Sequence, residues 1–520
     1  MRFIIRILLI ASLAATFTYA LTLPHFQHII VIVQENRTPD NLFGSNPTFL
    51  SGVDIQTPPG GQWCLGACFD PSHTNAAWQN DLQPNWCNPR YVSTAGCGSP
   101  PGNPPVTFCN GQPVGPGPGQ LHMPTCPQKT YVSGTWDNSV VSPYFDIATK
   151  YGFANYFFQT NQGPSMPAHQ FLFSGTSAPS GVLNQGRWNY FEAENPTPGN
   201  KGAGCTAEAT VSTELINPSG IENVSVYPCF THNSLPTLLD PAGISWRYYA
   251  NKDWAIWNAP NAIYDICMPL DGQQNMCTGS DYINNDVLNP SQVLRDLGAA
   301  SHQECNLKQM SWVIPNGDRS DHPGLLSGTQ NHSTDIEGGP AWVADIINTL
   351  GNDPGQCGYW NNTAVFIVWD DWGGFYDHVS PFKVVNDGKS WGSGYVYGFR
   401  VPLLVVSAYT PAGYVSGKLP SPGENFPYIH DFGSILGFIE NNFLGSGKIG
   451  QINPGYQFAD AFAPDFKVQP LNIPLADFFP LTWARTFQAI TLSTGAPDAN
   501  YFLNYNGPIL DPDNDVIDND

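Results

Sequence analysis

Charged residues are scarce in this chain. Only 12% of its 520 residues are Asp, Glu, Lys or Arg, whereas about 25% is typical of soluble proteins. Basic residues are the rarer kind, since 20 Lys and Arg stand against 42 Asp and Glu, and the formal net charge is −22. This negative charge repels the phosphate backbone of nucleic acids and the surface of anionic membranes. We therefore expect no nucleic acid as a partner and no electrostatic attraction to a membrane.

Long apolar stretches are missing after the first 20 residues. At the start, two arginines precede a largely apolar run, Ile7–Phe17, and small residues follow at Thr18 and Ala20. This is the pattern of a secretory signal with its cleavage site. A membrane anchor is the alternative, but the run is shorter than the ~20 residues that a spanning helix needs. We expect residues 1–20 to be a signal peptide, and the protein to be secreted, extracellular or periplasmic, without a stable membrane anchor.

No Cys-x2-Cys pair occurs among the twelve cysteines. Because zinc ribbons need such pairs, disulfides are the better interpretation, and they suit an exported protein. Half of the cysteines crowd into a stretch rich in Gly and Pro at about residues 56–130, which we interpret as a disulfide-rich loop insertion. We expect these six to pair largely among themselves, and they are Cys64, Cys68, Cys87, Cys97, Cys109 and Cys126.

Two short apolar runs, far apart in the chain, end at oxygen-bearing side chains. Val365–Trp369 is followed by two aspartates, and Ile29–Val33 leads into Gln34 and then a Glu-Asn pair. Runs of this kind are typical of buried parallel strands. If the two strands are parallel neighbours, their side chains converge where open α/β sheets bind ligands. Buried carboxylates need a compensating cation, so the pattern indicates a metal site rather than a solvated turn. The four residues are Glu35, Asn36, Asp370 and Asp371.

Ser165 lies at the start of a predicted helix. Pro167 suits the first helical turn, and Ser165 then sits where backbone N–H groups and the helix dipole favour an alkoxide or a phosphate. The alternative is that Ser165 only caps the helix. A third predicted strand, Met310–Pro315, is followed by polar residues that include His322. Polar side chains therefore follow the end of this strand as well.

The other apolar patterns complete an α/β chain, in which strands and helices alternate. We predict strands at Ile244–Tyr249 and Pro402–Ser407, and helices at Tyr144–Phe153, from Leu235 onward, at Ala341–Leu350 and at Ser434–Phe443.

Seven segments, taken in order, resemble one known family. The chain is similar to the bacterial phosphoesterase family that contains phosphatidylcholine-type phospholipases C and related acid phosphatases, within the alkaline-phosphatase-like superfamily. The Gln-Glu-Asn-Arg and Asp-Asp-Trp-Gly-Gly segments are specific, and the rest support them. The segments are His28–Arg37, Asp40–Gly44, Gly163–Ser165, Ser320–Pro323, Trp369–Val379, Gly398–Ser407 and His430–Glu440.

The resemblance implies a fold and a metal. The fold is a mostly parallel central sheet flanked by helices, and residues 21–520 form a single phosphoesterase catalytic domain that carries the insertion. One divalent metal ion is implied. Oxygen ligands suit Ca²⁺, Mg²⁺ or Mn²⁺, and Zn²⁺ and Fe remain open. The implied ligands are Glu35, Asn36, Ser165, Asp370 and Asp371.

The resemblance also implies catalytic roles. Ser165 is the implied nucleophile, while His322 and His73 are the implied phosphate-binding or proton-donating histidines. Phosphatases of the family carry a further Asp-His pair in mid-chain, whereas none occurs here between Ser165 and Ser320. The stretch Trp257–Cys267, with Asp265, is where we look for a substitute.

We therefore expect a secreted metal-dependent enzyme that hydrolyses phosphate esters through a serine nucleophile. Phospholipase C-like cleavage of a phosphodiester is favoured, and the alternative is an acid phosphatase that acts on phosphomonoesters. A serine acyl hydrolase is disfavoured because the chain lacks a Gly-x-Ser-x-Gly segment. A secreted binding protein with a degenerate site is a further alternative, suggested by 13% aromatic residues and many loops.

Overall fold

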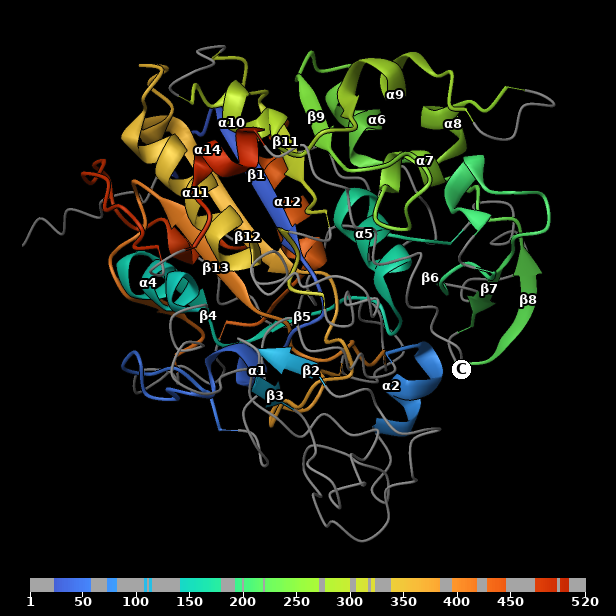
Figure 1. The fold of residues 1–520 in the computed structure, drawn as a ribbon, viewed down its shortest axis with the longest axis horizontal. Helices are drawn as coiled ribbons and strands as arrows, with labels where there is room; N and C mark the ends of the chain where they lie inside the picture. Colours follow the sequence, from blue (N-terminus) through green and yellow to red (C-terminus); the bar gives the residue numbers. More distant parts are fainter. Residues whose placement is uncertain are drawn as a thin grey trace, which may run out of the picture.

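The structure is a computed structural model, and its central feature is an eight-stranded sheet (Figure 1). The expected signal peptide and most of the insertion lie outside the residues that the structure describes. The described residues are 23–57, 73–81, 107–109, 112–114, 141–178, 192–198, 201–217, 220–270, 276–299, 305–316, 319–322, 338–383, 395–418, 428–445, 473–492 and 496–504.

The central sheet is mixed but mostly parallel, with the spatial order β10-β9-β11-β1-β12-β13-β4-β14. The first five strands in this order run parallel to one another, and β13 is antiparallel to both of its neighbours. The predicted α/β class is thus confirmed. The strands are β1 (His28–Gln34), β4 (Gly152–Ala154), β9 (Trp246–Tyr249), β10 (Asp286–Val287), β11 (Met310–Val313), β12 (Thr363–Trp369), β13 (Leu403–Ser407) and β14 (Tyr414–Ser416).

Strands β1 and β12 are the parallel neighbours that their sequences predict. Every residue of β12 is buried, as is every residue of β1 after His28, because helices cover both faces of the sheet. In the register of the pair, Gln34 lies opposite Trp369. Strand β11 lies along the other side of β1. The loops that follow these three strands therefore start at the same edge of the sheet.

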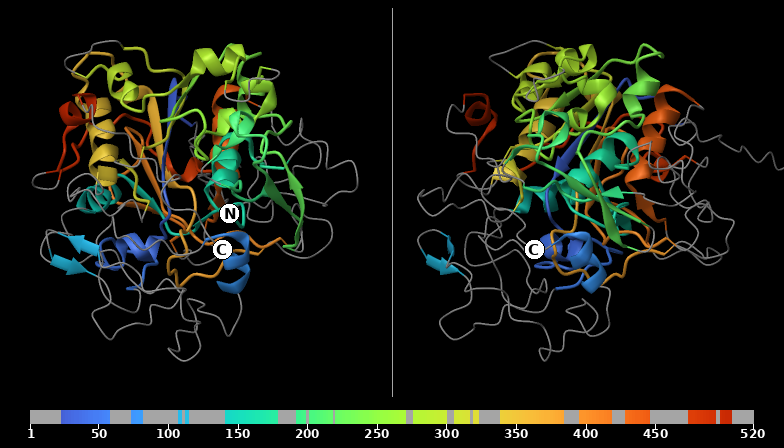
Figure 2. Two further views of the ribbon diagram at one scale, coloured as in Figure 1. Left: turned by 45° about the vertical axis from the view of Figure 1, so that its right-hand side comes forward. Right: turned by 90° about the vertical axis from the view of Figure 1, so that its right-hand side faces the viewer.

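The longer helices form two groups. α11 (Gly338–Asn352) packs against α4 (Ser142–Lys150) and α14 (Ala499–Asn504), while α5 (Ser165–Ser174) packs against α12 (Phe432–Phe443). The two groups lie on opposite faces of the sheet (Figure 2). α11 and α12 confirm the helices predicted at 341–350 and 434–443.

The helix predicted at Tyr144–Phe153 is wrong at its C-terminal end. α4 ends at Lys150, and the next residues form β4. Gly152 pairs with Val405 of β13 and Tyr414 of β14. A Cβ atom at Gly152 would lie 2.8 Å from the ring of Phe478, so close packing requires glycine there. The apolar run predicted as one helix thus contributes to both α4 and β4.

Shorter elements surround this core. The predicted helix from Leu235 is a single short one, α6. Besides the 3₁₀ turns at Gly204–Thr206, Trp360–Asn362 and Ala476–Phe478, the described elements are α1 (Pro39–Phe43), α2 (Asn75–Asp81), α6 (Leu235–Leu239), α7 (Ala259–Ala262), α8 (Tyr264–Cys267), α9 (Ser280–Asn285), α10 (Gln292–Asp296), β2 (Thr107–Cys109), β3 (Gln112–Val114), β5 (Phe157–Phe158), β6 (Glu192–Ala193), β7 (Thr213–Ile216), β8 (Glu222–Val226) and β15 (His430–Asp431).

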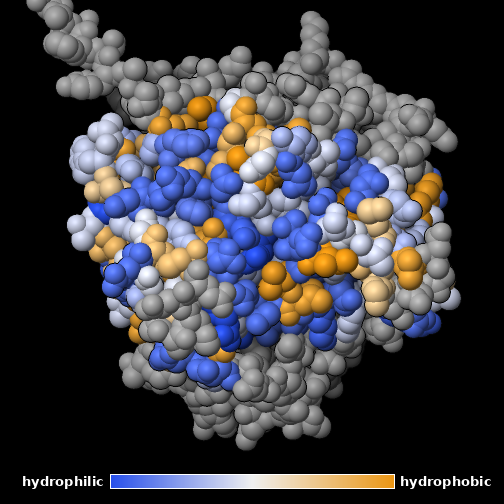
Figure 3. Space-filling model, turned by 90° about the horizontal axis from the view of Figure 1, so that it is seen from above, coloured by the Kyte–Doolittle hydropathy of each residue, from blue (hydrophilic) through white to orange (hydrophobic). Residues whose placement is uncertain are grey.

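Six cysteines outside the insertion pair as disulfides, Cys205–Cys229, Cys267–Cys277 and Cys305–Cys357. The pairing expected among the six cysteines of the insertion lies outside what the structure describes. Within the described residues, no helix is both long enough and apolar enough to span a bilayer. Seen from above, the described surface is mostly polar, and its apolar side chains form separate patches (Figure 3).

Candidate metal and nucleophile site

The loops after β1 and β12 are tied together by backbone hydrogen bonds. Asp370 N–H donates to Gln34 O at 2.9 Å, and Arg37 N–H donates to Asp371 O at 3.0 Å. Asp370 Oδ1 accepts from the N–H groups of Asn36, at 3.0 Å, and Asp371, at 2.7 Å. The structure therefore brings the predicted pairs of oxygen-bearing side chains together at one buried point.

Two residues with positive φ allow this close contact. Asn36 has φ 56° and Gly373 has φ 59°, in the left-handed region that favours glycine and tolerates asparagine. Gly373 N–H donates to Asp371 Oδ1 at 2.6 Å. This bond fixes one oxygen of the Asp371 carboxylate and leaves Oδ2 for other partners.

Ser165 is one such partner of Asp371. It is the first residue of α5, and the cap position belongs to Pro164. The N–H of Met166 in the first turn donates to Asn195 Oδ1 at 3.0 Å, not to Ser165. Ser165 Oγ instead donates to Asp371 Oδ2 at 3.2 Å. The interpretation of Ser165 as a helix cap is therefore wrong. Its hydroxyl faces the aspartate pair, at the helix end where the dipole favours negative charge.

His169, which the sequence reasoning missed, lies one helical turn beyond Ser165. Its Nε2 is 3.3 Å from Glu35 Oε1 and 3.8 Å from Asp370 Oδ2, and all three side chains are fully buried. Burial lowers the pKa of His169 to about 4, and the nearby Asp370 only partly offsets this. The sequence did contain an indication of this role, because His169 is four residues after Ser165 and residues four apart share one face of a helix.

The predicted histidines His73 and His322 both lie beside this point. His73 is only 2% exposed, and its Nε2 is 3.2 Å from Asn36 Nδ2 and 3.9 Å from Asp371 Oδ2. The ring centroids of His73 and His322 are 6.3 Å apart. His73 comes from the insertion, where a lone loop histidine is usually exposed, so its burial here was not predictable from composition.

Gln34 holds the segment that carries His322. Its Oε1 accepts from Asp321 N–H at 2.9 Å, and its Nε2 donates to Arg319 O at 2.8 Å. Burial raises the pKa of Asp321 to about 6, and its Oδ2 accepts from Tyr144 and Trp369. Asp321 thus anchors this segment rather than facing Ser165.

The stretch Trp257–Cys267 contributes an aromatic ring to the site. The Trp257 ring lies 6.3 Å from the His169 ring, nearly parallel to it, and 5.9 Å from the His322 ring. Asp265, considered as a substitute for a second Asp-His pair, is exposed on α8. That expectation is therefore wrong, and it is Trp257 that closes this side of the site.

The donor atoms fit a divalent cation. Asn36 Oδ1 and Asp370 Oδ2 are buried and make no hydrogen bond within the described part of the chain. Ligand atoms of Glu35, His169 and Asp370 lie within 4.8 Å of one another. Buried carboxylates this close repel each other unless positive charge compensates them. The residues present therefore fit a bound cation.

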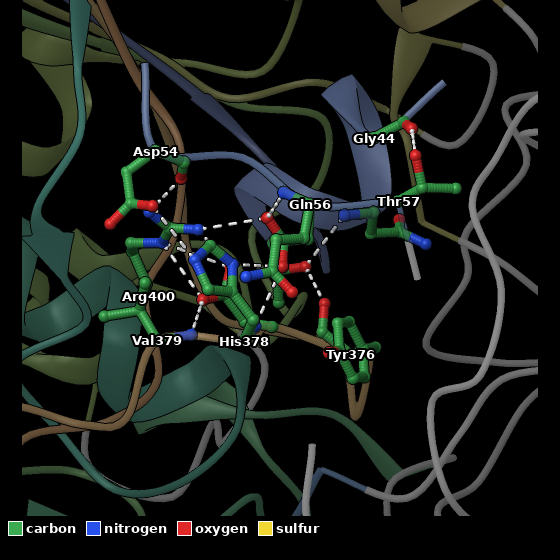
Figure 4. Close-up of polar contacts among 12 residues, drawn as sticks. Gly44, Asp54, Gln56, Thr57, Tyr376, His378, Val379 and Arg400 are labelled. Atoms are coloured by element: carbon green, nitrogen blue, oxygen red, sulfur yellow. Dashed lines mark hydrogen bonds and ion pairs between the residues drawn. The ribbon is translucent and has the colours of Figure 1, made fainter. Parts of the chain in front are cut away.

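A second polar cluster joins residues further along the same two loops and is shown in Figure 4. The buried guanidinium of Arg400 bonds both carboxylate oxygens of Asp377 at 3.0–3.1 Å and Asp40 Oδ1 at 3.2 Å. His378 Nδ1 is 2.7 Å from Asp40 Oδ2, and its Nε2 is 3.1 Å from Asp54 Oδ1. Arg400 supplies the positive charge here, so this cluster needs no metal.

Comparison with known proteins places the chain in a family. The model of the Phosphoesterase family matches residues 26–444. The chain belongs to this family. The resemblance inferred from the motifs is thereby confirmed.

Curated relatives match parts of the chain. Phospholipase C B from Mycobacterium tuberculosis is 29% identical over 217 residues, 38% of this chain and 37% of that protein. Non-hemolytic phospholipase C from Pseudomonas aeruginosa is 22% identical over 466 residues, 80% of this chain and 54% of that protein. The chain thus spans about a third to a half of the length of these relatives.

Solved structures match weakly. A protein in the alkaline phosphatase superfamily from Vibrio parahaemolyticus aligns with 9% identity and a TM-score of 0.24, over 51% of this chain and 53% of that chain. The lipoteichoic acid synthase LtaP from Listeria monocytogenes aligns with 12% identity and a TM-score of 0.28, over 79% of this chain and 78% of that chain.

Proposed function

We propose that the protein is a secreted, metal-dependent phosphoric ester hydrolase in which Ser165 is the nucleophile. The observation that carries this proposal is the contact between Ser165 Oγ and Asp371 Oδ2, at 3.2 Å, at the N-terminus of α5. The hydroxyl has a proton acceptor in reach, and the helix end favours the alkoxide that forms. Membership of the Phosphoesterase family supports the reaction class.

Glu35, Asn36, Asp370 and Asp371 would hold the metal together with the Ser165 hydroxyl. A bound divalent cation supplies positive charge for the serine alkoxide and for the phosphate oxygens. The protein's part is to place the donors, and the hydrogen bonds between the loops after β1 and β12 fix their positions.

The reaction then follows two balanced steps. Ser165 Oγ forms a bond to phosphorus as its proton moves to Asp371, the bond to the leaving oxygen breaks, and His73 protonates that oxygen. Water next attacks phosphorus and gives a proton to His73, and the bond to Oγ breaks as Asp371 returns the serine proton. Phosphoryl transfer depends mostly on such positioning and charge compensation.

His322 and Trp257 would bind the substrate beside this centre. The His322 ring lies 6.3 Å from that of His73 and 5.9 Å from that of Trp257. An imidazole in this place can donate a hydrogen bond to a phosphate oxygen. The neighbouring indole presents an apolar wall to the group that the phosphate esterifies.

We favour phosphodiester cleavage of the phospholipase C type because the relatives are phospholipases C. Hydrolysis of a phosphomonoester, as in an acid phosphatase, is the second candidate. A chromogenic diester and a monoester with the same nitrophenol leaving group separate the two. The higher kcat/KM identifies the substrate class, and release from neither ester would favour a degenerate binding protein.

The nucleophile is tested by Ser165→Ala. We expect the mutation to lower turnover at least about 1000-fold, because no other hydroxyl takes the place of the nucleophile. Stability should change by about 1 kcal/mol, the usual contribution of one hydrogen bond. The matched control is Ser174→Ala, which removes a buried hydroxyl at the other end of α5 and should keep turnover.

Ser165→Thr keeps a hydroxyl and should retain measurable, chelator-sensitive turnover. Near-normal turnover in Ser165→Ala would remove Ser165 from the mechanism and leave water as the direct attacking group.

A further inference from the structure

His169 is a buried imidazole whose environment does not satisfy its nitrogens. The side chain is fully buried, and neither Nδ1 nor Nε2 makes a hydrogen bond within the described residues. A buried polar group left in this state destabilises the folded protein. Such a cost is usually retained only where a ligand or another partner repays it.

The surroundings of His169 fix the direction of its ring. α5 places it one turn from Ser165, on the helix face toward the two ligand loops. The Trp257 ring lies 6.3 Å from it at an interplanar angle of 23°. Nε2 therefore faces the space between Glu35 and Asp370, at 3.3 Å and 3.8 Å from their nearest oxygens.

We infer that His169 Nε2 is a ligand of the cation, in addition to the oxygen donors. This inference rests on the proposed function, because it concerns the same metal. It changes the class of ion that the site prefers, because oxygen-only ligands suit Ca²⁺, Mg²⁺ or Mn²⁺, whereas an imidazole nitrogen favours Zn²⁺ or Fe²⁺. The site is then a mixed nitrogen and oxygen site that selects a transition metal.

Metal binding tests the inference without measuring turnover. Zn²⁺, Mn²⁺ and Ca²⁺ are titrated calorimetrically into the chelator-treated wild type, His169→Ala and His169→Gln. We expect His169→Ala to weaken Zn²⁺ binding at least about tenfold, since even indirect partners of a metal contribute 10–100-fold. Ca²⁺ binding should change less than Zn²⁺ binding. His169→Gln is the second variant because it fills the space that alanine leaves.

The control for the titration is His232→Ala. His232 is also buried and lies beside α5, with its Nε2 3.2 Å from Gln170 Oε1, but it is not part of the ligand cluster. We expect it to bind Zn²⁺ as the wild type does. Equal Zn²⁺ affinity in the wild type and both His169 variants would overturn the inference.

Pulsed EPR of the Mn²⁺-loaded protein detects the nitrogen directly. The wild type should show couplings from a bound imidazole nitrogen, and His169→Ala should lose them while His73→Ala keeps them. Loss in His73→Ala alone would assign the nitrogen ligand to His73 and overturn the inference while leaving the proposed function intact. Failure of the wild type to bind any of the three ions would overturn both.

Discussion

Gly373 occupies a position where any other residue would press against Asn36, a proposed ligand of the metal. Its φ is 59°, and a Cβ atom there would lie 2.6 Å from Cβ and O of Asn36. We expect Gly373→Ala to cost a few kcal/mol of unfolding free energy, about 1 from the backbone and the rest from overpacking. Metal affinity should fall as well, because Asn36 must shift.

The control for Gly373→Ala is Gly358→Ala. Gly358 has a φ of 72° and nothing within 4 Å of the added Cβ, so this change carries only the backbone cost. Urea unfolding and metal titration of both variants give the comparison. Equal destabilisation, with metal affinity unchanged in both, would show that the contact with Asn36 is not what requires glycine.

Single residues also show where reasoning from the sequence ends. The apolar runs before Glu35 and Asp370 predicted that these side chains would meet, because parallel strands end at one edge of a sheet. His169 was missed although its spacing from Ser165 was visible, because the sequence does not say which face of a helix a site will use. The burial of His73 depends on how a loop-rich insertion folds back, which no local pattern encodes.

At the scale of elements, the cluster around Arg400 joins segments far apart in the chain. Asp40 follows β1, Asp377 and His378 follow β12, and Arg400 precedes β13. These contacts link the later residues of the two loops whose first residues are the proposed metal ligands. The sequence predicted the strands but not this cluster, because pairing among separated charged residues leaves no periodic pattern.

The cluster predicts a pH dependence of stability. Burial lowers the pKa of His378, but hydrogen bonds and charge from Asp40 and Asp54 outweigh it and raise the pKa from 6.5 to about 9. The stabilisation is therefore complete below pH 6.5 and disappears as the pH rises through about 9. After allowance for solvent screening we expect about 2 kcal/mol.

Urea unfolding at pH 6 and at pH 9.5 measures this loss. In His378→Gln the side chain can still bond to Asp40 but no longer titrates, so the difference between the two pH values should shrink by about the same 2 kcal/mol. An undiminished difference in the variant would assign the pH dependence to other groups.

For the whole molecule, two features predict that cations stabilise the folded state: the excess of negative charge and the buried acidic site. The net charge of −22 is screened by any salt, with a Debye length of about 8 Å at 0.15 M. A buried carboxylate cluster is screened much less and responds to an ion that binds there. The two effects can therefore be separated by comparing Mn²⁺ with K⁺ at matched ionic strength.

We expect Mn²⁺ to raise the thermal unfolding midpoint of the chelator-treated protein beyond the effect of K⁺. Binding to the folded state alone adds about 2.7 kcal/mol at a concentration 100 times the Kd, and excess chelator should reverse it. Asp371→Asn keeps the shape of a ligand but loses its charge, so its midpoint should rise only at higher Mn²⁺ concentrations. If Mn²⁺ and K⁺ act equally on both proteins, the acidic cluster does not bind Mn²⁺, and protons rather than this ion must neutralise its buried carboxylates.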